Sequence, residues 1–458
     1  MKKGIVLRVA LISLLFLFST ANAAIWYVHP DSLLNSIQAG INSCSTGDTV
    51  LVAPGIYYEN INFKGKAITV TSEQGANTTI IDGGNPANPD SASVVAFVSR
   101  EDTNSVLKGF TITNGSGTYN IYWGLSGGGI YCDSSSSPTI TSNIITGNTA
   151  LYGGGIECID SSSPNITGNT ITNNRANVTG GGIDLYDYCS PLIEGDTITG
   201  NTAFKAGGGI CCDENSSATI KKNFISGNTA DEGGGIGCGN SSFPIITDNT
   251  ITDNTANVYG GGIRCRESSP IIENCTISSN NGEGVYCKVG ANPIINYNNI
   301  TDNTSYGVYN EDSDVIINAL HNWWGEPSGP YHPITNPSGL GDSVSNYVDF
   351  VPWLLEAGIG EQEPDHNVFF ISQGKPNPFI DRTVIEYSLP RSCDVLITVY
   401  NLIGAKIKTL LNERRNAGTH TITWDGRDEI DNKVPSGFYF LRIEAGKYEG
   451  TRKLLLMR

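Results

Sequence analysis

The sequence predicts an all-β chain in which a solenoid of stacked parallel strands is followed by a small β-sandwich. Three observations support this prediction. The composition disfavours long helices, the middle of the chain is a tandem repeat, and residues 374–458 contain short alternating strands bounded by turn residues.

The composition of the chain is that of a β protein. Glycine accounts for 54 of the 458 residues and charged residues for only 16%. β-branched residues and scattered aromatics argue against disorder. Residues 24–373 hold 11 Lys and Arg against 35 Asp and Glu, a net charge of −24. Such a surface repels nucleic acid, so we expect no nucleic-acid partner.

Residues 1–23 are predicted to be a signal peptide. Lys2 and Lys3 precede an apolar run from Val9 to Phe18, and Ala21 and Ala23 provide small residues for cleavage before residue 24. An uncleaved anchor is the alternative. No later stretch approaches the ~18 apolar residues of a membrane span, so we expect a mature chain without one, secreted or attached to the outer cell surface.

Residues 24–125 are expected to form an N-terminal cap and the first coils. The segment 36–42 reads as an amphipathic capping helix, and residues 47–57 read as the strand and turn of the first coil. The segments 60–61, 65–68 and 79–83 continue this pattern.

Residues 126–320 form the regular repeats. Gly-Gly-Gly-Ile occurs six times between residues 127 and 263, with looser copies at Gly284 and Gly307, and the copies are 22 to 27 residues apart. A second pattern, Ser-Pro-x-Ile-x-x-Asn-x-Ile-x-x-Asn, lies between them. Such a period indicates a solenoid in which strands stack about 4.8 Å apart. We expect positive φ at the glycine corner.

Two isoleucine columns and one asparagine column follow from aligning the repeats. The isoleucines are expected to fill the core, and the asparagines to hydrogen-bond from coil to coil at a turn. The three columns are Ile140, Ile166, Ile193, Ile220, Ile246, Ile272 and Ile295, then Ile145, Ile171, Ile198, Ile225, Ile251, Ile277 and Ile300, and finally Asn148, Asn174, Asn201, Asn228, Asn254, Asn280 and Asn303.

These repeats resemble the right-handed parallel β-helix of the pectin-lyase-like superfold, with the repeats known as PbH1. Their Gly-Gly-Gly-Ile motif also resembles the Gly-Gly-Ala-Ile repeats of polymorphic outer-membrane adhesins. The resemblance implies a right-handed parallel β-helix. It leaves the function open, because this fold carries lyases, hydrolases, adhesins and passive spikes.

Six cysteines share one position, two residues after the corner Ile or Val. Period-2 geometry points this position inward, and side chains one coil apart are too distant for an ordinary disulfide. We therefore expect buried free thiols, with disulfides or metal ligation as the alternative. These cysteines are Cys132, Cys158, Cys212, Cys238, Cys265 and Cys287.

The chain after residue 320 divides into three segments. Residues 321–356 hold half of the six tryptophans and are expected to cap the open solenoid end, with a sugar-binding platform as the alternative. Residues 357–373, with Glu361 to Asp365, read as a linker. Residues 374–458 are predicted to be an Ig-like β-sandwich.

The tail resembles the type A C-terminal sorting domain of the type IX secretion system, which is related to the flagellar-hook-cap Ig-like module. The resemblance rests on the Pro376 to Phe379 opening, the strand runs at 384–389 and 395–401, and the basic, apolar ending from Thr451 to Arg458. It implies that type IX machinery is a partner of residues 374–458. An ordinary Ig-like accessory domain is the alternative.

Candidate catalytic and metal residues lie on the outward face of the strand after the glycine corner. This layout resembles that of calcium-dependent pectate lyases, which implies Glu157, Asp184 and Asp187 as ligands of Ca²⁺ and Arg264 as the base that acts on a uronate. Because repeats commonly carry surface carboxylates, we expect a solvated acidic face here, with the calcium-dependent chemistry as the alternative. The histidine and aspartate motifs of polygalacturonases are absent from the sequence.

The regular coils favour binding of an extended ligand over catalysis. Tyr152, Phe204 and Tyr259 precede glycine corners and are candidates for stacking on sugar rings, with local packing as the alternative. The sequence thus predicts a secreted or cell-surface protein that binds polysaccharide or another extended extracellular ligand. A calcium-dependent uronate lyase is the alternative, and the sequence does not name the ligand.

Overall fold

The computed structural model describes residues 23–122, 124–358, 370–372, 374–389, 392–402, 404–416, 418–446 and 448–457. The chain divides into two compact units, Met1–Gly360 and Glu361–Arg458. All but the last residue of the predicted signal peptide, and most of the predicted linker, lie outside the described residues. Among the described residues, no helix has the length and apolarity needed to cross a membrane.

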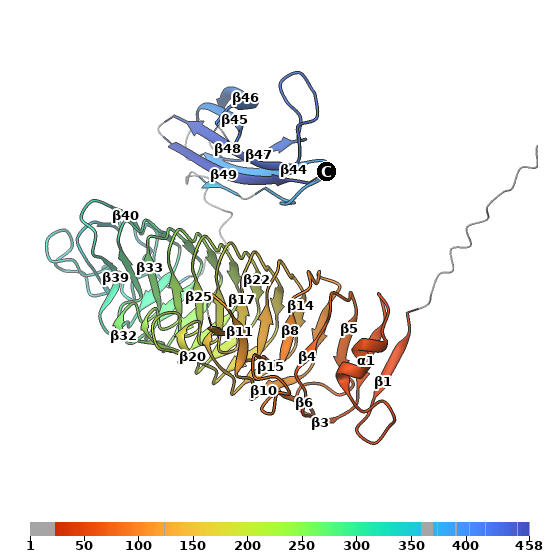
Figure 1. The fold of residues 1–458 in the computed structure, drawn as a ribbon. Helices are drawn as coiled ribbons and strands as arrows, with labels where there is room; N and C mark the ends of the chain where they lie inside the picture. Colours follow the sequence, from red (N-terminus) through yellow and green to blue (C-terminus); the bar gives the residue numbers. More distant parts are fainter. Residues whose placement is uncertain are drawn as a thin grey trace, which may run out of the picture. The chain divides into compact units, whose positions relative to one another are not determined.

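The N-terminal unit is the predicted solenoid, and its parallel strands stack coil upon coil (Figure 1). One full coil contains four strands, β14 (Thr139–Thr141), β15 (Ile144–Thr146), β16 (Thr149–Tyr152) and β17 (Ile156–Cys158). Each strand pairs with its counterpart in the coils before and after, so the unit contains four long sheets. We name them sheet A, sheet B, the lip sheet and sheet C, in chain order.

Sheets A and B are wholly parallel. Sheet A contains, in spatial order, β1 (Ile25–Val28), β2 (Thr49–Val52), β5 (Thr69–Ser72), β9 (Val106–Lys108), β14, β18 (Asn165–Thr167), β22 (Leu192–Glu194), β26 (Thr219–Lys221), β30 (Ile245–Thr247), β34 (Ile271–Glu273), β37 (Ile294–Asn296), β40 (Ile317–Asn318) and β42 (Val348–Asp349). Sheet B contains β3 (Gly55–Tyr57), β6 (Thr79–Asp82), β10 (Thr111–Thr113), β15, β19 (Thr170–Thr172), β23 (Thr197–Thr199), β27 (Phe224–Ser226), β31 (Thr250–Thr252), β35 (Thr276–Ser278) and β38 (Asn299–Thr301).

The lip sheet and sheet C flank the glycine corner. The lip sheet contains β7 (Ser91–Ala92), β11 (Gly117–Asn120), β12 (Gly124–Ser126), β16, β20 (Arg175–Thr179), β24 (Thr202–Ala203), β28 (Thr229–Glu232) and β32 (Thr255–Tyr259), with β11 antiparallel to both neighbours. Sheet C contains β4 (Ile61–Asn62), β8 (Val95–Phe97), β13 (Ile130–Cys132), β17, β21 (Ile183–Leu185), β25 (Ile210–Cys212), β29 (Ile236–Cys238), β33 (Ile263–Arg266), β36 (Val285–Lys288), β39 (Tyr306–Asn310) and β41 (Ser343–Val344).

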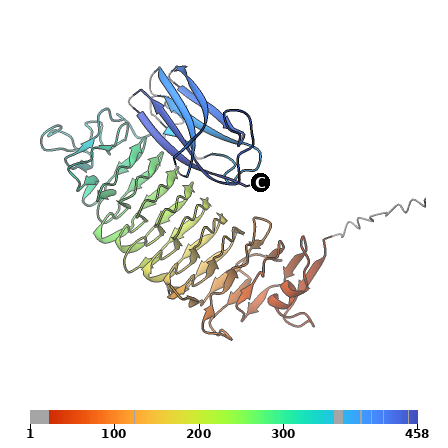
Figure 2. The same ribbon diagram turned by 45° about the horizontal axis from the view of Figure 1, so that its top comes forward.

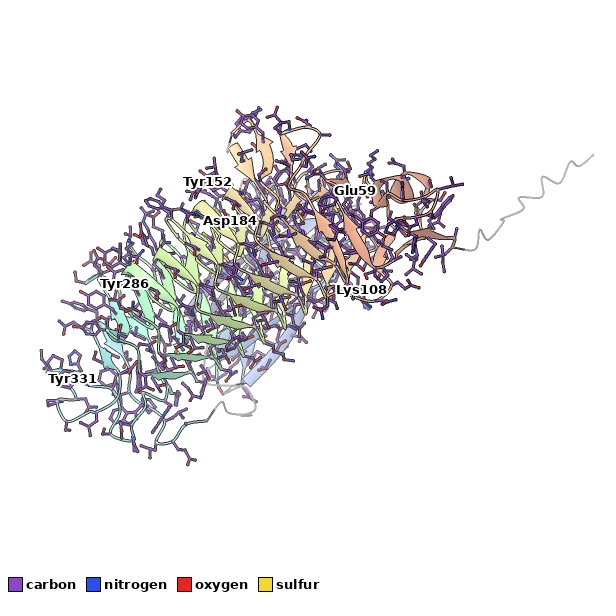
Figure 3. All side chains as sticks on the ribbon, turned by 90° about the horizontal axis from the view of Figure 1, so that it is seen from below. Glu59, Lys108, Tyr152, Asp184, Tyr286 and Tyr331 are labelled. Carbon is purple, nitrogen blue, oxygen red and sulfur yellow. The ribbon has the colours of Figure 1, made fainter. Side chains whose placement is uncertain are left out.

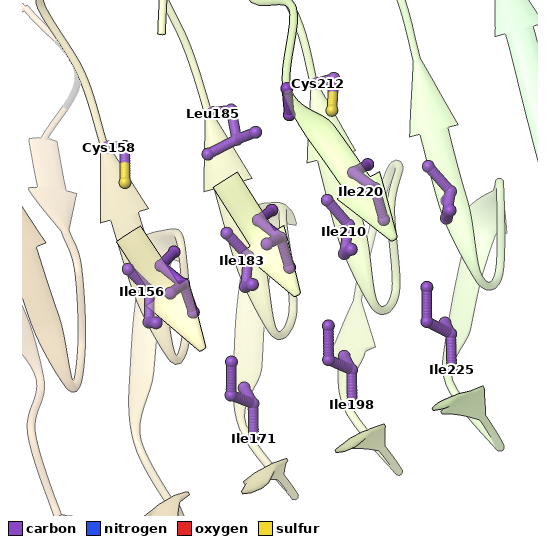
Figure 4. Packing of buried hydrophobic residues seen from close by; sticks show 14 of the residues in the cluster. Ile156, Cys158, Ile171, Ile183, Leu185, Ile198, Ile210, Cys212, Ile220 and Ile225 are labelled. Atoms are coloured by element: carbon purple, nitrogen blue, oxygen red, sulfur yellow. The ribbon is translucent and has the colours of Figure 1, made fainter. Parts of the chain in front are cut away.

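The solenoid core consists of the predicted isoleucine columns. All fourteen isoleucines are fully buried, and register pairs such as Ile145 and Ile171 stack directly. A third column from sheet C faces them, and Figure 4 shows its members Ile156, Ile183 and Ile210 in a row. Burial of each such side chain stabilises the fold by roughly 1.5–3 kcal/mol relative to exposure.

The predicted cysteine column is confirmed as part of this core. All eleven cysteines, each among the described residues, are free and buried. Figure 4 shows Cys158, Leu185 and Cys212 in one line, so the slot accepts either a thiol or a leucine. Burial raises the pKa of the Cys158 and Cys212 thiols, which keeps them protonated and unreactive.

Asparagine ladders close the turns on either side of sheet B. In the predicted ladder, the Asn148 side chain donates to Asn174 Oδ1 at 3.0 Å and to the Ile112 carbonyl at 3.0 Å. A second ladder closes the turn between sheets A and B. It begins at Asn143, whose Nδ2 donates to Asn169 Oδ1 at 3.2 Å. Each buried amide therefore joins three successive coils.

The glycine corner has two separate requirements. Gly153 adopts φ 58°, as expected for the first glycine of the motif. Gly155 is needed for space instead, because a Cβ there would lie 2.5 Å from the Gly182 carbonyl oxygen of the next coil. Close approach of coils, rather than positive φ, explains the third glycine.

Both ends of the solenoid are covered. The helix α1 (Ile37–Ser43) lies at the N-terminal end, and Glu59 accepts hydrogen bonds from Ser36 Oγ and from the backbone N–H groups of Ile37 and Gln38. At the other end, Trp324 is fully buried against the last coil.

The C-terminal unit is a small antiparallel β-sandwich, drawn in blue in Figure 2. One sheet contains β43 (Phe370–Ile371), β44 (Thr383–Leu389) and β47 (Gly418–Trp424), and the other contains β46 (Lys406–Arg415), β45 (Cys393–Asn401), β48 (Gly437–Ala445) and β49 (Tyr448–Leu456). Trp424 packs edge-on against Phe379 and Tyr439 in the core. Tyr439 donates its hydroxyl to the Pro435 carbonyl at 2.8 Å, as in the tyrosine corner of Ig-like folds.

Candidate functional site

The lip sheet covers the outward face of sheet C. The lip strands β12, β16, β20, β28 and β32 end at the residue before the first glycine of the corner, and at Thr179 and Glu232 this residue contacts a first outward position of sheet C. Thr179 Oγ1 thus donates to Asp184 Oδ2 at 2.7 Å, and Glu232 forms an ion pair with Arg264 at 2.7 Å. Figure 3 shows Tyr152, Asp184 and Tyr286 along one flank of the solenoid.

The sequence-predicted acidic pair is correctly stacked but is not solvated. Glu157 and Asp184 are register partners on β17 and β21. Their exposed fractions are only 2% and 1%, because Gly153 and Gly180 of the lip pack against their side chains. The expectation of a solvated acidic face is therefore wrong at these two positions. Period-2 alternation placed them outward but gave no sign of the sheet that folds over them.

Burial sets the protonation of this pair. Burial and the charge of Asp184 raise the pKa of Glu157 well above its usual value, and Glu157 Oε2 has no hydrogen-bond partner among the described residues. Burial raises the pKa of Asp184 to about 7, while hydrogen bonds from Thr179 and Cys211 oppose the rise and Asp213 adds to it. Burial therefore disfavours the charged form of both carboxyl groups.

Arg264 belongs to a compact ion cluster under the lip. Its guanidinium pairs with Glu232 and donates to the Cys238 carbonyl at 3.0 Å, and Lys288 Nζ contacts the same carboxylate at 2.8 Å. Burial alone would raise the pKa of Glu232, but the hydrogen bond from Lys288 and the charges of Lys288 and Arg264 hold it below its usual value. Arg264 is thus engaged in structural contacts.

A stack of tyrosines continues from this cluster. The rings of Tyr259 and Tyr286 stack at 4.5 Å, those of Tyr286 and Tyr309 at 5.4 Å, and Lys288 Nζ lies 4.5 Å from the centre of the Tyr259 ring. Tyr259 therefore packs locally. Tyr152 lies on the same inner side of the lip, since it is the register partner of Thr179.

The remaining predicted ligand, Asp187, lies in the turn after β21. It adopts φ 61°, and its carbonyl accepts the Ser161 N–H at 2.9 Å. Within the described part of the chain, no group of three or more His, Cys, Asp or Glu side chains is arranged to hold a metal ion. Glu157 and Asp184 supply two carboxyl groups, fewer than the six to eight oxygens that Ca²⁺ takes.

Phe204 is the predicted aromatic that faces solvent. It follows β24, and 67% of its side chain is exposed. Neighbouring residues on the lip alternate in direction, so the alanines of the lip face inward and the residues that follow them face outward. We call these outward residues, together with Leu125 opposite Leu151 and its register partner Tyr119, the outer lip row, and its members are Tyr119, Leu125, Leu151, Asn177, Phe204, Asp231 and Asn257.

Sequence reasoning missed most of the outer lip row. Tyr119 is 53% exposed and lies on β11, before the first regular repeat, where no periodic signal marks it. One signal for the lip was present in the spacing. Coils of 27 residues carry a five-residue segment between Asn and the glycines, as in Arg175–Thr179, and coils of 26 carry four, as in Thr149–Tyr152. The extra residue forms a bulge in a strand.

Comparison with known families identifies the solenoid. The family described as the right handed beta helix region matches residues 42–201 and 176–323, which together exceed half of the chain. The chain belongs to this family. The FlgD Ig-like domain family matches residues 381–449, in the C-terminal unit.

Comparisons with individual proteins cover curated sequences and solved structures. No curated protein sequence matches the chain. Among solved structures, the chain is similar to the enzymatically active domain of tailspike protein 2 from bacteriophage CBA120, with 11% identity and a TM-score of 0.42 over 95% of this chain and 76% of that one.

Proposed function

We propose that the solenoid binds an extended polysaccharide along the outer lip row, and that the protein acts outside the cell as a binding protein rather than an enzyme. The observation that carries this proposal is the make-up of the row. Phe204 and Tyr119 are more than half exposed, and amide side chains at Asn177 and Asn257 lie between and beyond them.

The spacing of the row suits a polymer. Four strand steps separate Tyr119 from Phe204, about 19 Å at ~4.8 Å per step. Aromatic faces bind the apolar faces of sugar rings, and amides bind hydroxyl groups, so such a row has the two kinds of contact that sugars need. Repeated strands present these contacts along one straight line.

The alternative function, a calcium-dependent uronate lyase, finds less support. It needs Glu157, Asp184 and Arg264 to meet a substrate at the surface. The two carboxyl groups are buried, which disfavours their charged form, and Arg264 is paired with Glu232. A base must be able to reach the substrate, whereas the donors of this guanidinium are engaged by Glu232 and the Cys238 carbonyl.

Export by the type IX system is the second part of the proposal. Its support is the Ig-like fold of the C-terminal unit and the basic, apolar ending of the chain. In a host with type IX machinery, deletion of residues 374–458 is expected to leave the solenoid in the periplasm. Normal release of the truncated chain would contradict this assignment.

Affinity electrophoresis tests the binding function. The purified chain is run through gels that contain neutral or acidic polysaccharides, and the same mixtures are assayed for unsaturated uronate products. We expect retardation by at least one polysaccharide without product. Product formation would establish the lyase alternative, and no retardation by any polysaccharide would remove the binding function.

A further inference from the structure

The N-terminal coils contain a shallow, open surface pocket that reaches the start of the lip strand β16. It has a volume of about 620 Å³, within the ~300–1,000 Å³ of small-molecule sites. It lies where β3, β6, β10 and β15 end, in four successive coils of sheet B. Its main lining side chains are Tyr58, Asp82, Asn85, Asn114, Ser116 and Thr149.

The pocket marks a break in the repeat. In the regular coils, the last residue of the sheet B strand is a threonine or serine, as at Thr113 and Thr146. Asp82 occupies that position in the preceding coil and is the register partner of Thr113. A loop of residues 83–90 follows, in place of the short turn found in later coils. Solenoid sites are expected at such irregular coils, because a regular coil repeats without them.

The polar floor of the pocket is pre-organised. Asn114 Nδ2 donates to Asp82 Oδ2 at 2.9 Å, and the Gly84 N–H donates to Asp82 Oδ1 at 2.9 Å. The loop is fixed at both ends, because the Gly83 N–H donates to the Thr113 carbonyl at 2.9 Å and the Tyr119 N–H donates to the Asp90 carbonyl at 2.9 Å. These side chains and the loop therefore lose little further conformational entropy when a ligand binds.

One wall of the pocket is aromatic. Tyr58 follows β3, and its side chain is 71% exposed. It lies beside Asp82, because Tyr57 is the register partner of Ile81. A Cβ on Gly84 would lie 3.1 Å from both Asn114 Cβ and Asp82 Oδ1, so a side chain at this position would crowd the floor.

The lining selects the class of ligand. A single carboxylate is too little for a divalent cation, and in a strongly acidic chain it repels uronates, phosphates and nucleotides. The amides, hydroxyls and carboxylate disfavour an apolar ligand. An aromatic face beside fixed acceptors and donors suits a ring with apolar C–H faces and hydroxyls at its edge.

The geometry points to a subsite for one neutral sugar ring, with Tyr58 against the ring face and the Asp82–Asn114 pair at its hydroxyls. This assignment rests on the proposed function, since it names the sugar class that the solenoid holds. The pocket fixes one neutral unit of the chain, and the outer lip row supplies contacts of lower specificity.

Isothermal titration of the full chain tests the subsite. The probes are neutral gluco-, manno-, galacto- and xylo-oligosaccharides and an oligogalacturonate. We expect a neutral probe to bind. Tyr58→Ala and Asn114→Ala are each expected to weaken it about tenfold, as the loss of one good contact does. Gly84→Val is expected to weaken it at least as much, by filling the pocket.

Phe224→Ala is the matched control, because this exposed aromatic of sheet B lies outside the pocket. It should leave affinity within about twofold. Unchanged affinity in all three pocket variants, with a wild type that binds, would overturn the subsite and leave the proposed function standing. Preference for the oligogalacturonate would overturn the neutral class. A wild type that binds no probe, and is retarded by no polysaccharide, would remove both.

Discussion

Asp196 accepts two hydrogen bonds from Asn169, one from the backbone N–H at 2.6 Å and one from Nδ2 at 2.9 Å. It replaces an asparagine in the ladder between sheets A and B. In the next coil, Asn223 Nδ2 donates to the Ile193 carbonyl at 2.9 Å. The corresponding atom of Asp196, Oδ2, is buried without a hydrogen-bond partner in the described structure. A carboxylate cannot donate, so this position is satisfied only when Asp196 carries a proton.

The first prediction concerns Asp196→Asn. Burial raises the pKa of Asp196 to about 7, partly offset by the hydrogen bonds from Asn169 and reinforced by the charge of Glu194. An unfolded aspartate titrates near ~3.9, so the folded state binds more protons between about pH 4 and 7 and stability falls as pH rises through that window. The asparagine amide of the Asp196→Asn variant does not titrate, so its folding stability does not fall with pH at this position. We expect a gain of about 1–3 kcal/mol at pH 8 and little gain at pH 4 in urea unfolding. An equal gain at both pH values would argue against a protonated Asp196.

The second prediction concerns the stacked pair under the lip. Asp184 faces Glu157, Asp213, Cys211 and Tyr152. Its raised pKa again means that stability is lost as pH rises from about 4 to about 7. Asp184→Asn should raise the melting temperature at pH 8, and Glu157→Gln should add less to this variant than it gives alone, because Asp184→Asn has already removed the charge that helps to raise the pKa of Glu157. Fully additive gains would show that the two carboxyl groups do not interact.

The third prediction concerns the core thiols. The native chain should resist alkylation, because all eleven cysteines are buried. After denaturation without reductant, mass spectrometry should find every cysteine of the column alkylated. Disulfide-linked peptides among Cys132, Cys158, Cys212, Cys238, Cys265 and Cys287 under those conditions would contradict the structure.

The fourth prediction concerns the close approach of coils. Gly155→Ala places a Cβ 2.5 Å from the Gly182 oxygen, so it should destabilise the solenoid by roughly 1–3 kcal/mol. Gly358→Ala is the control, since nothing lies within 4 Å of its added Cβ. Thermal melts followed by circular dichroism compare the two. Equal melting temperatures of the two variants would contradict this prediction, because they would mean that the coils can move apart at Gly155 without loss of stability.

The repeat period predicted the core well because inward residues recur at fixed offsets. Ile145, Ile171 and Asn148 could be placed before any coordinates, since each has one role in every coil. The outward residues could not. Glu157 was assigned the correct face, but whether that face is open depends on where the chain turns at Gly153, and alternation says nothing about that. Tyr58 and Asp82 lie in irregular coils before the regular repeats, so no recurring offset in the sequence marks them as parts of one site.

The most direct test of the central claim is the dissociation constant of the chain for the polysaccharide that retards it, measured for wild type and for a Tyr119→Ala, Phe204→Ala double variant. Phe243→Ala, which removes an equally exposed aromatic outside the outer lip row, is the control. Binding along the outer lip row predicts at least about tenfold weaker affinity for the double variant and an unchanged control. Equal affinity of the double variant and wild type would contradict it.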